Sequence, residues 1–497
     1  MEQESIYALN PEYFLKPDKN RALISNKGGD PRIKDFMGFV HPVYAILLSL
    51  FDGEKKLDQV ISIAAKILKK DSAIISNIIT PLLENEEELY FQFDGCHFSF
   101  PTQVLVKRNR QHIHNKLNPE SFFIPKKDLD FETRRLNTPL DALFMVNTRC
   151  VTNCVYCYVD RGKNMDCDLP VERLKKLIRE AKELEIRNIN ITGGELFLYK
   201  NWQVLLSELL TNGFTPYIST KCPIDEKTIC ELKDMGLKQI QISIDSIVSG
   251  ELCLMLKVKP DYAGKLVETL RTLDKKGFEI YTNTQVTSIN QGSIPQLLDF
   301  LLSLKNIKRI NMGAAAFSLY LGEAKYKAYK ANLEALEQLK TKVETLSKQH
   351  EGKVSLNFSG YYEKSGLIGK SKAEKKKDFN GRARCSGNFY SFTILPDGKV
   401  TVCEELYWHP KFIISDLSKQ SIEEMWNSTQ ALDFYNISQE KIRAESRCKE
   451  CEAFDPCHKN QGVCWKEVLY AYGVDNWDYP DPKCPYASEP NHEYYLS

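Results

Sequence analysis

Two hydrophobic patterns alternate along residues 140–350. Short apolar runs, the pattern of buried parallel strands, predict strands at residues 142–147, 188–191, 215–219, 239–244, 279–286 and 309–313. Between them, apolar residues recur at helical spacing and predict helices at residues 171–184, 202–211, 226–235, 262–276 and 294–304. Strands that alternate with helices predict an α/β fold with a parallel sheet. Because six such units are too few for a closed eight-stranded barrel, we expect a partial (β/α)6 barrel of the TIM type, with ligands at the carboxyl ends of its strands.

The pattern before residue 116 is of another kind. Short apolar runs predict strands at residues 13–15 and 22–24, helical spacing follows at residues 42–51, 57–68 and 73–83, and residues 89–100 form an extended run. This order predicts a separate α+β domain of winged-helix type over residues 1–115. Residues 116–138 hold proline, asparagine and mixed charges with little periodicity, so we expect a linker there.

The end of the chain has few long periodic segments. After residue 351 the sequence turns basic and loop-like, around residues 370–377, and then becomes rich in cysteine. A region of this kind is expected to fold around metal rather than around a large apolar core. We therefore predict a barrel domain over residues 139–350 and a cysteine-rich metal-binding domain over residues 351–497.

Composition indicates what the protein does not bind. The 497 residues are 42% hydrophobic and 27% charged, which is ordinary for a soluble chain of two or three domains. Against 66 acidic residues, 67 basic ones leave a net charge of +1, so no strong field attracts nucleic acid or an anionic membrane. The first 18 residues lack the pattern of a signal peptide, and no apolar run reaches the roughly 18 residues of a spanning helix. We expect a cytoplasmic protein without nucleic-acid or membrane partners.

Fifteen cysteines are many for a cytoplasmic protein. A reducing compartment disfavours disulfides, which leaves metal binding or catalysis as the usual uses. One group of three follows the first predicted barrel strand: Cys150, Cys154 and Cys157. A second group lies toward the end of the chain: Cys385, Cys403, Cys448, Cys451, Cys457, Cys464 and Cys484. The other five are scattered and are expected to be thiols without a metal role: Cys96, Cys167, Cys222, Cys230 and Cys253.

The first group has the spacing of an iron–sulfur cluster with one open position. Three thiolates at Cys150, Cys154 and Cys157 can hold three irons of a cubane and leave the fourth iron free for a ligand. That iron can bind the amino and carboxylate groups of S-adenosylmethionine and deliver one electron to the sulfonium. The result is a 5′-deoxyadenosyl radical that abstracts hydrogen. A zinc site is the alternative interpretation of three neighbouring thiolates.

The motif of these three cysteines, CxxxCxxC, resembles that of the radical S-adenosylmethionine (radical SAM) superfamily. Residues 192–195, Thr-Gly-Gly-Glu, are similar to the GGE motif, in which the turn contacts the methionine amino group of the cofactor. Glycine suits this role because a backbone without Cβ can approach a ligand closely. Ser219 and Thr220 follow the third strand, where the family often offers hydroxyls, and residues 243–245 resemble its SxD pattern. The resemblance implies these cofactor contacts and names no catalytic base: Thr192, Gly193, Gly194, Glu195, Ser219, Ser243 and Asp245.

The second cysteine group resembles the SPASM domain, which holds two auxiliary clusters. The resemblance implies one cluster on Cys385, Cys403 and Cys464. It implies a second on four thiols: Cys448, Cys451, Cys457 and Cys484. Six residues separate Cys457 from Cys464 where the family usually has three, and the first cluster would have only three of these ligands. The first cluster would therefore have either an open iron or a ligand that the sequence does not reveal. Zinc ribbons, which also use CxxC pairs, are the alternative interpretation of these cysteines. With the radical cluster, three 4Fe–4S clusters are implied.

The amino-terminal domain is similar to the peptide-recognition elements of pathways that modify ribosomally made peptides. In that family a leader peptide adds a strand to a sheet edge and packs against the third helix, which is ordinary β-augmentation. A winged-helix DNA binder has the same order of helices. Asp71 before the third predicted helix and four glutamates within residues 84–88 after it disfavour a surface that faces phosphate.

Together the resemblances imply a radical SAM maturase of a ribosomally synthesised precursor peptide, with an electron donor such as ferredoxin or flavodoxin. An open auxiliary iron could bind a substrate thiolate, so thioether crosslinking of a cysteine to another residue is the favoured reaction. Carbon–carbon or carbon–oxygen crosslinking, epimerisation and anaerobic sulfatase maturation remain alternatives. An iron–sulfur electron carrier or binding module is the alternative outside enzymes, and it would have no use for a cofactor-binding turn at residues 192–195.

Overall fold

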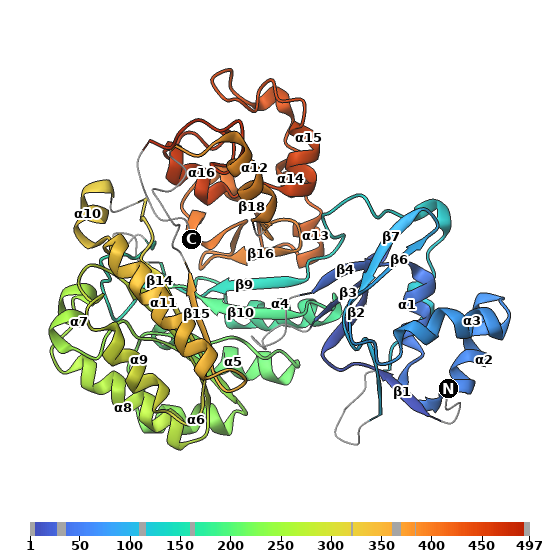
Figure 1. Cartoon of the computed structure of the whole chain (residues 1–497), viewed down its shortest axis with the longest axis horizontal. Coiled ribbons are helices and arrows are strands. Elements are labelled where there is room, and N and C mark those ends of the chain that lie inside the picture. The colour runs from blue at the N-terminus through green and yellow to red at the C-terminus, as the bar shows by residue number, and fades with distance from the viewer. Residues whose placement is uncertain are drawn as a thin grey trace. The chain divides into compact units, whose positions relative to one another are not determined.

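The computed structural model describes residues 5–26, 36–108, 116–159, 165–319, 322–359, 369–382 and 384–491. The chain divides into two compact units, residues 1–138 and residues 139–497 (Figure 1). No helix among the described residues is both long enough and apolar enough to cross a bilayer.

The first unit combines short antiparallel sheets with three helices. One sheet has the order β2-β3-β4, with β2 at Tyr13–Pro17, β3 at Ala22–Asn26 and β4 at Met37–Val40. A second has the order β5-β1-β8, with β1 at Ile6–Leu9, β5 at Asp52–Lys56 and β8 at Leu105–Lys107. The helices are α1 (Pro42–Ser49), α2 (Leu57–Leu68) and α3 (Ser72–Ile79).

The extended run predicted at residues 89–100 is in fact a hairpin of β6 (Leu89–Phe93) and β7 (Cys96–Phe100). The chain reverses at Asp94 and Gly95, both with positive φ, which is the backbone of a tight two-residue turn. Leu89, Phe91 and Phe93 alternate with more exposed residues, so one face of the hairpin packs on the core of the unit. The winged-helix arrangement predicted for residues 1–115 remains a proposal.

Residues 116–138 are tied to the first unit by buried polar groups. The fully buried Arg21 guanidinium donates to the backbone carbonyls of Thr133 and Arg135, and it pairs with Asp18 at 2.9 Å. The Asp18 carboxylate in turn accepts from the Asn137 N–H at 2.9 Å. The segment also holds two 3₁₀ turns, η2 (Pro119–Phe122) and η3 (Lys126–Asp128).

The second unit begins with the predicted parallel strands, in chain order. They are β9 (Asp141–Met145), β10 (Asn188–Thr192), β11 (Ser219–Thr220), β12 (Gln239–Ser243), β13 (Glu279–Val286) and β14 (Ile307–Ala314). A further parallel strand, β15 (Ser355–Ser359), was not predicted and lies past residue 350. β9 pairs with β10, β11 to β15 pair in sequence, and a parallel bridge between Ile191 and Ile218 joins the two runs. This α/β order is consistent with the predicted partial barrel.

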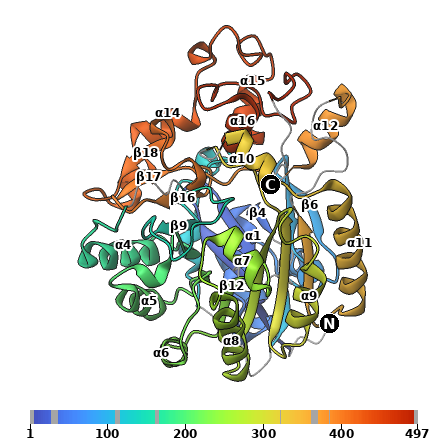
Figure 2. The same ribbon diagram turned by 90° about the vertical axis from the view of Figure 1, so that its left-hand side faces the viewer.

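The predicted crossover helices lie around these strands (Figure 2). They are α4 (Val171–Glu183), α5 (Trp202–Thr211), α6 (Glu226–Asp234), α8 (Tyr262–Lys275) and α9 (Ile294–Leu302). Three further helices were not predicted: α7 (Ser249–Leu256), α10 (Gly322–Tyr329) and α11 (Leu333–Gln349). Ile240 and Ile242 of β12, and Ile244 directly after it, are buried in the core that these helices cover. The intervening residues, which carry the polar groups of the strand, lie on its other face.

The strand predicted at residues 215–219 is much shorter in the structure. Only Ser219 and Thr220 pair with β12 as a strand, and Ile218 makes a single bridge to β10. Pro216 has no N–H to donate to a ladder. The next amide, of Tyr217, donates to the Asn190 side chain at 3.0 Å instead of to a neighbouring strand.

The cysteine-rich region joins the barrel through its sheet. β16 (Ser391–Ile394) pairs in parallel with β9 and continues to β17 (Lys399–Thr401) and β18 (Ile413–Asp416). Four of its helices are α12 (Lys372–Gly381), α13 (Ile422–Trp426), α14 (Thr429–Tyr435) and α16 (Trp465–Tyr472). The expectation of a basic loop at residues 370–377 was wrong, because Ser371 and Glu374 form a capping box that starts α12.

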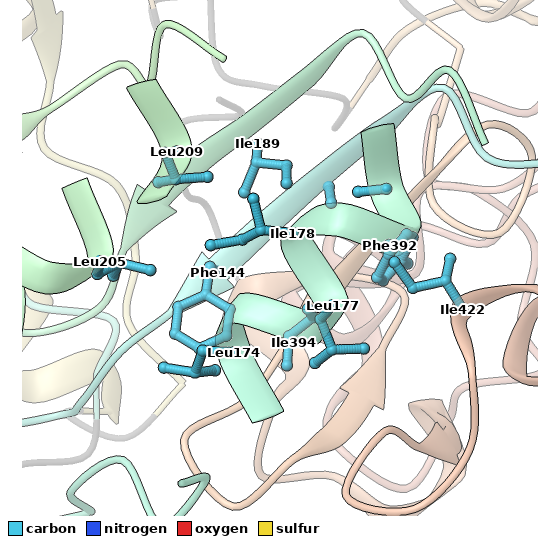
Figure 3. A pocket seen from close by; sticks show the side chains of 12 residues that line it. Phe144, Leu174, Leu177, Ile178, Ile189, Leu205, Leu209, Phe392, Ile394 and Ile422 are labelled. Atoms are coloured by element: carbon cyan, nitrogen blue, oxygen red, sulfur yellow. The ribbon is translucent and has the colours of Figure 1, made fainter. Parts of the chain in front are cut away.

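The region also has more apolar core than the sequence pattern indicated. Phe392, Phe412 and the fully buried Trp426 belong to the same hydrophobic core as the barrel. Figure 3 shows where the two parts meet: side chains of β9 and α4 face Phe392, Ile394 and Ile422 around a small, wholly apolar space. This space is part of the core and offers no polar group to a cofactor.

Candidate active site

The loop after β9 carries the first cysteine group. Thr152 Oγ1 lies 3.3 Å from Cys150 Sγ and 3.2 Å from Cys154 Sγ, so the loop turns both thiols toward one hydroxyl. Main-chain hydrogen bonds to α7 hold it: the N–H groups of residues 153 and 155 donate to the carbonyls of Leu256 and Met255 at 2.8 and 2.9 Å. The Ser318 hydroxyl donates to the Cys157 carbonyl at 2.9 Å. The loop thus brings the thiols of Cys150 and Cys154 to one hydroxyl and anchors the backbone of Cys157.

The turn after β10 is locked against the residues that precede Cys150. The Gly194 N–H donates to the Asn147 carbonyl at 2.7 Å. A Cβ at Gly193, where φ is +128°, would lie 2.3 Å from the Asn147 oxygen, and one at Gly194 would lie 1.7 Å from the Arg149 oxygen. Both glycines are therefore required for contact between two backbone segments, a reason that the sequence alone did not reveal.

Glu195 links the ends of three neighbouring strands. Its buried carboxylate accepts from the Thr220 hydroxyl, which lies 2.8 Å from each oxygen, and from the Phe197 N–H at 3.3 Å. Its carbonyl accepts from the Asn147 amide at 3.0 Å. Burial raises the pKa of the Glu195 carboxyl, although the hydrogen bond from Thr220 acts in the opposite direction. The side chain is thus engaged within the protein and holds β9, β10 and β11 in register.

Asp245 lies at the centre of a second buried group. Its Oδ1 accepts from the Gln285 N–H at 2.9 Å, and its Oδ2 accepts from Lys221 Nζ at 2.8 Å and from the Tyr156 hydroxyl. Lys221 Nζ also donates to the Tyr156 oxygen at 3.0 Å. Tyr156 stands between Cys154 and Cys157 in the chain, so Asp245 is connected directly to the cysteine loop. Sequence reasoning missed Lys221 and Tyr156, for which the only signals were their positions after a strand and inside the motif.

Ser219 and Ser243 belong to a separate polar network. The Ser219 hydroxyl donates to the Gln241 side chain, whose amide donates to the Ser243 oxygen at 2.9 Å. The structure therefore brings these two predicted cofactor contacts together through Gln241. Their side chains do not share the hydrogen bonds of Asp245.

Thr192 connects the turn after β10 with the cysteine-rich region. Its hydroxyl donates to the Glu404 carboxylate at 2.9 Å, and the Tyr158 hydroxyl donates to the same oxygen at 3.1 Å. Glu404 directly follows Cys403 in the chain. Burial raises the pKa of the Glu404 carboxyl, against which the hydrogen bond from Thr192 acts. Glu404 was not predicted, because its partners lie more than 200 residues away in the sequence.

The second cysteine group separates into two sets of interacting thiols. Cys385 interacts electrostatically with Cys403 and with Cys464. The other thiols interact among themselves: Cys448, Cys451, Cys457 and Cys484. Burial raises the pKa of Cys403, Cys448 and Cys457 to about 12, so each thiol is costly to ionise without a cation or metal beside it. The two ligand sets implied by the sequence remain a proposal.

The donors of both cysteine groups are thiols, which are the usual ligands of iron–sulfur clusters. The loop after β9 carries three of them, a number that would leave one iron of a cubane open. Among the described residues, no group of three or more histidine, cysteine, aspartate and glutamate side chains is arranged to hold a metal ion.

Two protein-family models match regions of the chain that contain cysteines of the first and second groups. Residues 145–301 match the model of the Radical SAM superfamily. Residues 385–452 match SPASM, described as an iron–sulfur cluster-binding domain. The first match contains the loop of Cys150 and the residues around Asp245. The second contains the thiols from Cys385 to Cys451.

Curated relatives match only in part. A probable GTP 3′,8-cyclase of Archaeoglobus fulgidus is 29% identical over 110 residues, which are 20% of this chain and 34% of that protein. The GTP 3′,8-cyclase of Helicobacter pylori is 27% identical over 162 residues, 31% of this chain and 50% of that protein. The chain thus spans about a third to a half of the length of these relatives.

Solved structures match over nearly the whole chain. The crystal structure of Streptococcus suis SuiB bound to S-adenosylmethionine aligns with a TM-score of 0.64 at 16% identity, covering 96% of this chain and 99% of that chain. SuiB bound to the precursor peptide SuiA aligns with the same score and coverage at 14% identity. At these identities the likeness shows a shared fold. The superfamily model covers the cysteine loop after β9, and the SPASM model covers the second thiol group from Cys385 to Cys451. The chain is thus an enzyme that carries a radical SAM domain and a SPASM domain.

Proposed function

We propose that this enzyme modifies a ribosomally made precursor peptide by joining a cysteine sulfur of the peptide to another residue through a thioether. One observation carries the proposal. The chain combines a radical SAM domain, a SPASM domain and a further amino-terminal unit, and its fold matches that of SuiB over 96% of its length. SuiB is described in complex with a precursor peptide, which supports a peptide as the substrate class.

The proposed radical site consists of residues on the loop after β9 and at the ends of β10 to β12. Cys150, Cys154 and Cys157 would hold a 4Fe–4S cluster that binds S-adenosylmethionine, and together these groups supply a 5′-deoxyadenosyl radical for hydrogen abstraction. The contacts to S-adenosylmethionine are assigned to residues of the strand ends: Thr192, Gly193, Gly194, Glu195, Ser219, Ser243 and Asp245. The chain itself keeps the turn after β10 rigid, because Gly193 and Gly194 pack on residues 147–149.

Two auxiliary 4Fe–4S clusters complete the proposed set of three. Cys385, Cys403 and Cys464 would hold the first, and the set with Cys448 would hold the second. Three thiols on the first leave one iron for another ligand, and a thiolate of the substrate suits that position because thiolate is the usual ligand of such clusters. Glu404, the residue after Cys403, accepts hydrogen bonds from Thr192 and Tyr158. The proposed thioether-forming site and the proposed radical site would therefore lie next to each other.

The amino-terminal unit is proposed to bind the leader of the precursor, in the manner of a winged-helix peptide-recognition domain over residues 1–115. β3 is paired on both sides, whereas β2 and β6 each pair on one side only among the described strands. An extended leader can add to such an edge through main-chain hydrogen bonds. Tyr90 of β6 is 76% exposed and offers an aromatic contact beside that edge.

The remaining parts of the proposal follow from the redox chemistry. An electron donor such as ferredoxin or flavodoxin would reduce the radical cluster. None of the fifteen cysteines forms a disulfide in the structure, which suits a protein of a reducing compartment. In the proposed division, residues 116–138 connect the leader-binding domain to the barrel of residues 139–350, and residues 351–497 hold the auxiliary clusters.

The test uses the reconstituted enzyme, dithionite, S-adenosylmethionine and a synthetic candidate precursor peptide that contains cysteine. We expect formation of 5′-deoxyadenosine and a peptide product that has lost two hydrogens. A thioether leaves one cysteine resistant to alkylation by iodoacetamide, whereas a carbon–carbon bond leaves that thiol reactive and epimerisation leaves the mass unchanged. Absence of 5′-deoxyadenosine from fully loaded enzyme would contradict the proposal.

A further inference from the structure

One face of the barrel sheet is polar along three neighbouring strands. On β13, β14 and β15, Ile280, Ile310 and Leu356 belong to the core that the helices cover, so the residues that alternate with them lie on the opposite, inner face. These are Tyr281, Asn283, Gln285, Arg309, Asn311, Gly313, Ser355, Asn357 and Ser359. Asn357 is exposed and Asn311 is partly exposed, so the inner face reaches solvent. None of these residues is of the branched apolar kind that fills a closed barrel.

An arginine of the inner face has no partner within the described part of the chain. Arg309 is the third residue of β14, and the register places it between Tyr281 of β13 and Ser355 of β15. Its Nε is buried without a hydrogen-bond partner, and among the described residues its guanidinium forms no ion pair. Leaving a buried charged donor unpaired is costly, so the guanidinium suits an acceptor that comes from outside the chain.

The residues around Arg309 do not neutralise its charge. The Tyr281 ring meets the Tyr217 ring edge to face, with 6.2 Å between the centroids. Arg309 also acts on Tyr217, because burial raises the pKa of that hydroxyl to about 12 and the guanidinium opposes the effect. Glu279, two residues before Tyr281 on the same face, accepts from the Tyr281 hydroxyl at 3.5 Å and makes no ion pair with Arg309. Arg309 is thus a cation between aromatic rings, with no carboxylate paired to it among the described residues.

A row of asparagine amides lies beside Arg309, one step nearer the carboxyl ends of the strands. Asn357 donates to the Asn311 oxygen at 3.0 Å, and Asn311 donates to the Asn283 oxygen at 3.1 Å. The strand register places these three residues side by side. The amide nitrogen of Asn283, at the end of the row, has no acceptor among the described residues. Arg309 and Asn283 therefore offer N–H donors without a negative charge, which is the chemistry of a carboxylate site.

We propose that Arg309 binds a carboxylate of the substrate peptide on the inner face of the barrel. The inference rests on the proposed function, in which the substrate is a peptide, and it assigns a residue that selects among peptides. A planar guanidinium can form two parallel hydrogen bonds with a carboxylate. The site therefore takes an acidic side chain, or the terminal carboxylate of the peptide, in preference to a neutral group.

The position of Arg309 along β14 sets the reach of the bound peptide. Arg309 lies five residues before Ala314, where β14 ends, and at about 3.3 Å per residue this is about 17 Å. The proposed radical site lies at the strand ends, and an extended peptide covers the same distance with about five residues. We therefore expect the bound carboxylate and the modified residue to lie about five positions apart in the peptide.

Two substitutions separate charge from geometry, and a third is the control. Arg309→Gln removes the charge and keeps hydrogen-bonding groups, whereas Arg309→Lys keeps the charge and loses the planar pair of donors. Arg271→Gln is the matched control, because Arg271 is exposed on α8 and its guanidinium lies over the Phe300 ring, 5.9 Å from the centroid. Since Arg309 has no partner among the described residues, Arg309→Gln should keep the melting temperature of the wild type.

The probe is the synthetic cysteine-containing peptide, compared with copies in which each Asp or Glu is replaced by its amide and with a copy amidated at its carboxyl terminus. In the reconstituted holoenzyme, Arg309→Gln should raise the KM for the unaltered peptide by about tenfold or more, with the KM for S-adenosylmethionine unchanged. One amide copy should raise the KM of the wild type to the same extent and cause no further rise with Arg309→Gln. That copy identifies which carboxylate is bound. Arg309→Lys should fall between wild type and Arg309→Gln, and Arg271→Gln should match the wild type.

The outcomes separate this inference from the proposed function. If the wild-type enzyme forms no product from the peptide, the proposed function fails and the inference fails with it. With an active wild type, an unchanged peptide KM in Arg309→Gln overturns the carboxylate site alone, and so does a wild type that is indifferent to every amide copy. A change confined to S-adenosylmethionine makes Arg309 a cofactor contact and overturns it. A lower melting temperature or loss of iron in Arg309→Gln shows a structural role, which also overturns it.

Discussion

Replacing Gly194 by alanine places a methyl group where the structure has no room. The new Cβ would lie 1.7 Å from the carbonyl oxygen of Arg149, and an ordinary contact begins at 3.4 Å. Contacts of a Cβ atom shorter than 3.0 Å are essentially never seen, so the turn or the loop must move by at least 1.3 Å. The obstacle is backbone rather than the end of a flexible side chain, so no rotamer change relieves it. Overpacking of this kind typically costs about 1–3 kcal/mol.

The displacement reaches the radical site directly, because Cys150 is the residue after Arg149. A misplacement of about 1 Å can cost a catalyst on the order of 100-fold in rate. We expect Gly194→Ala to lower the melting temperature and to reduce cleavage of S-adenosylmethionine by about 100-fold, with the auxiliary iron retained. Cleavage is measured as 5′-deoxyadenosine by chromatography, and iron is measured per protein chain.

Gly264→Ala is the matched control, because Gly264 lies within α8 and a Cβ there meets nothing within 4 Å. Alanine in place of a helical glycine should stabilise the protein by about 0.5–1 kcal/mol and leave cleavage unchanged. A Gly194→Ala enzyme with the melting temperature and cleavage rate of the wild type would refute the claim that this turn is locked against the loop.

Three further predictions concern the ligands, the buried carboxylate and the amino-terminal unit. Cys150→Ala should abolish cleavage of S-adenosylmethionine and remove about four of roughly twelve irons, because the other two clusters keep their ligands. Thr220→Val should lower the melting temperature, since the buried Glu195 carboxylate loses a donor 2.8 Å away, at a cost of about 1–3 kcal/mol. Deletion of residues 1–138 should spare cofactor cleavage but slow modification of the full precursor at low peptide concentration, because tethering of the leader is lost.

Each of these has a control and a contradicting result. Cys230→Ala removes a thiol outside both cysteine groups and should change neither iron content nor cleavage. Thr220→Ser keeps the hydroxyl and should melt close to the wild type; equal melting of the valine variant would contradict the role given to the hydrogen bond. The deletion is scored only if iron content is retained, and an undiminished rate on the full precursor would show that the first unit does not bind the leader.

The parts predicted well are those whose signals are local. The helix expected at residues 202–211 coincides with α5, and the strand expected at residues 279–286 coincides with β13. A helix reveals itself within a few turns and a buried strand within a few residues, so neither needs distant partners to be recognised. The spacing of Cys150, Cys154 and Cys157 is a local signal of the same kind, and these residues lie within the region that matches the Radical SAM superfamily.

The parts that were missed depend on partners far along the chain. β1 was not predicted because its pairing joins Tyr7 to Lys107 and gives no pattern in a short window. The hairpin of residues 89–100 was taken for one extended run because alternation continues across the turn at Asp94. In the site, Lys221 had no distinguishing neighbour in sequence, and its meaning came from Asp245, 24 residues away.

The amino-acid sequence by itself determined the chemistry that this protein carries: the thiol groups, their spacing, and the order of strands and helices that presents them. Only the tertiary structure decided how those groups act on one another. It closed Gly194 onto Arg149, joined Lys221 to Asp245 and Tyr156, and brought Glu404 to Thr192 across 212 positions. The physical reason is the distance along the chain over which each effect acts. Side-chain type and periodicity are set within a few residues. Hydrogen bonds and charges act through space, between segments that only the fold brings together.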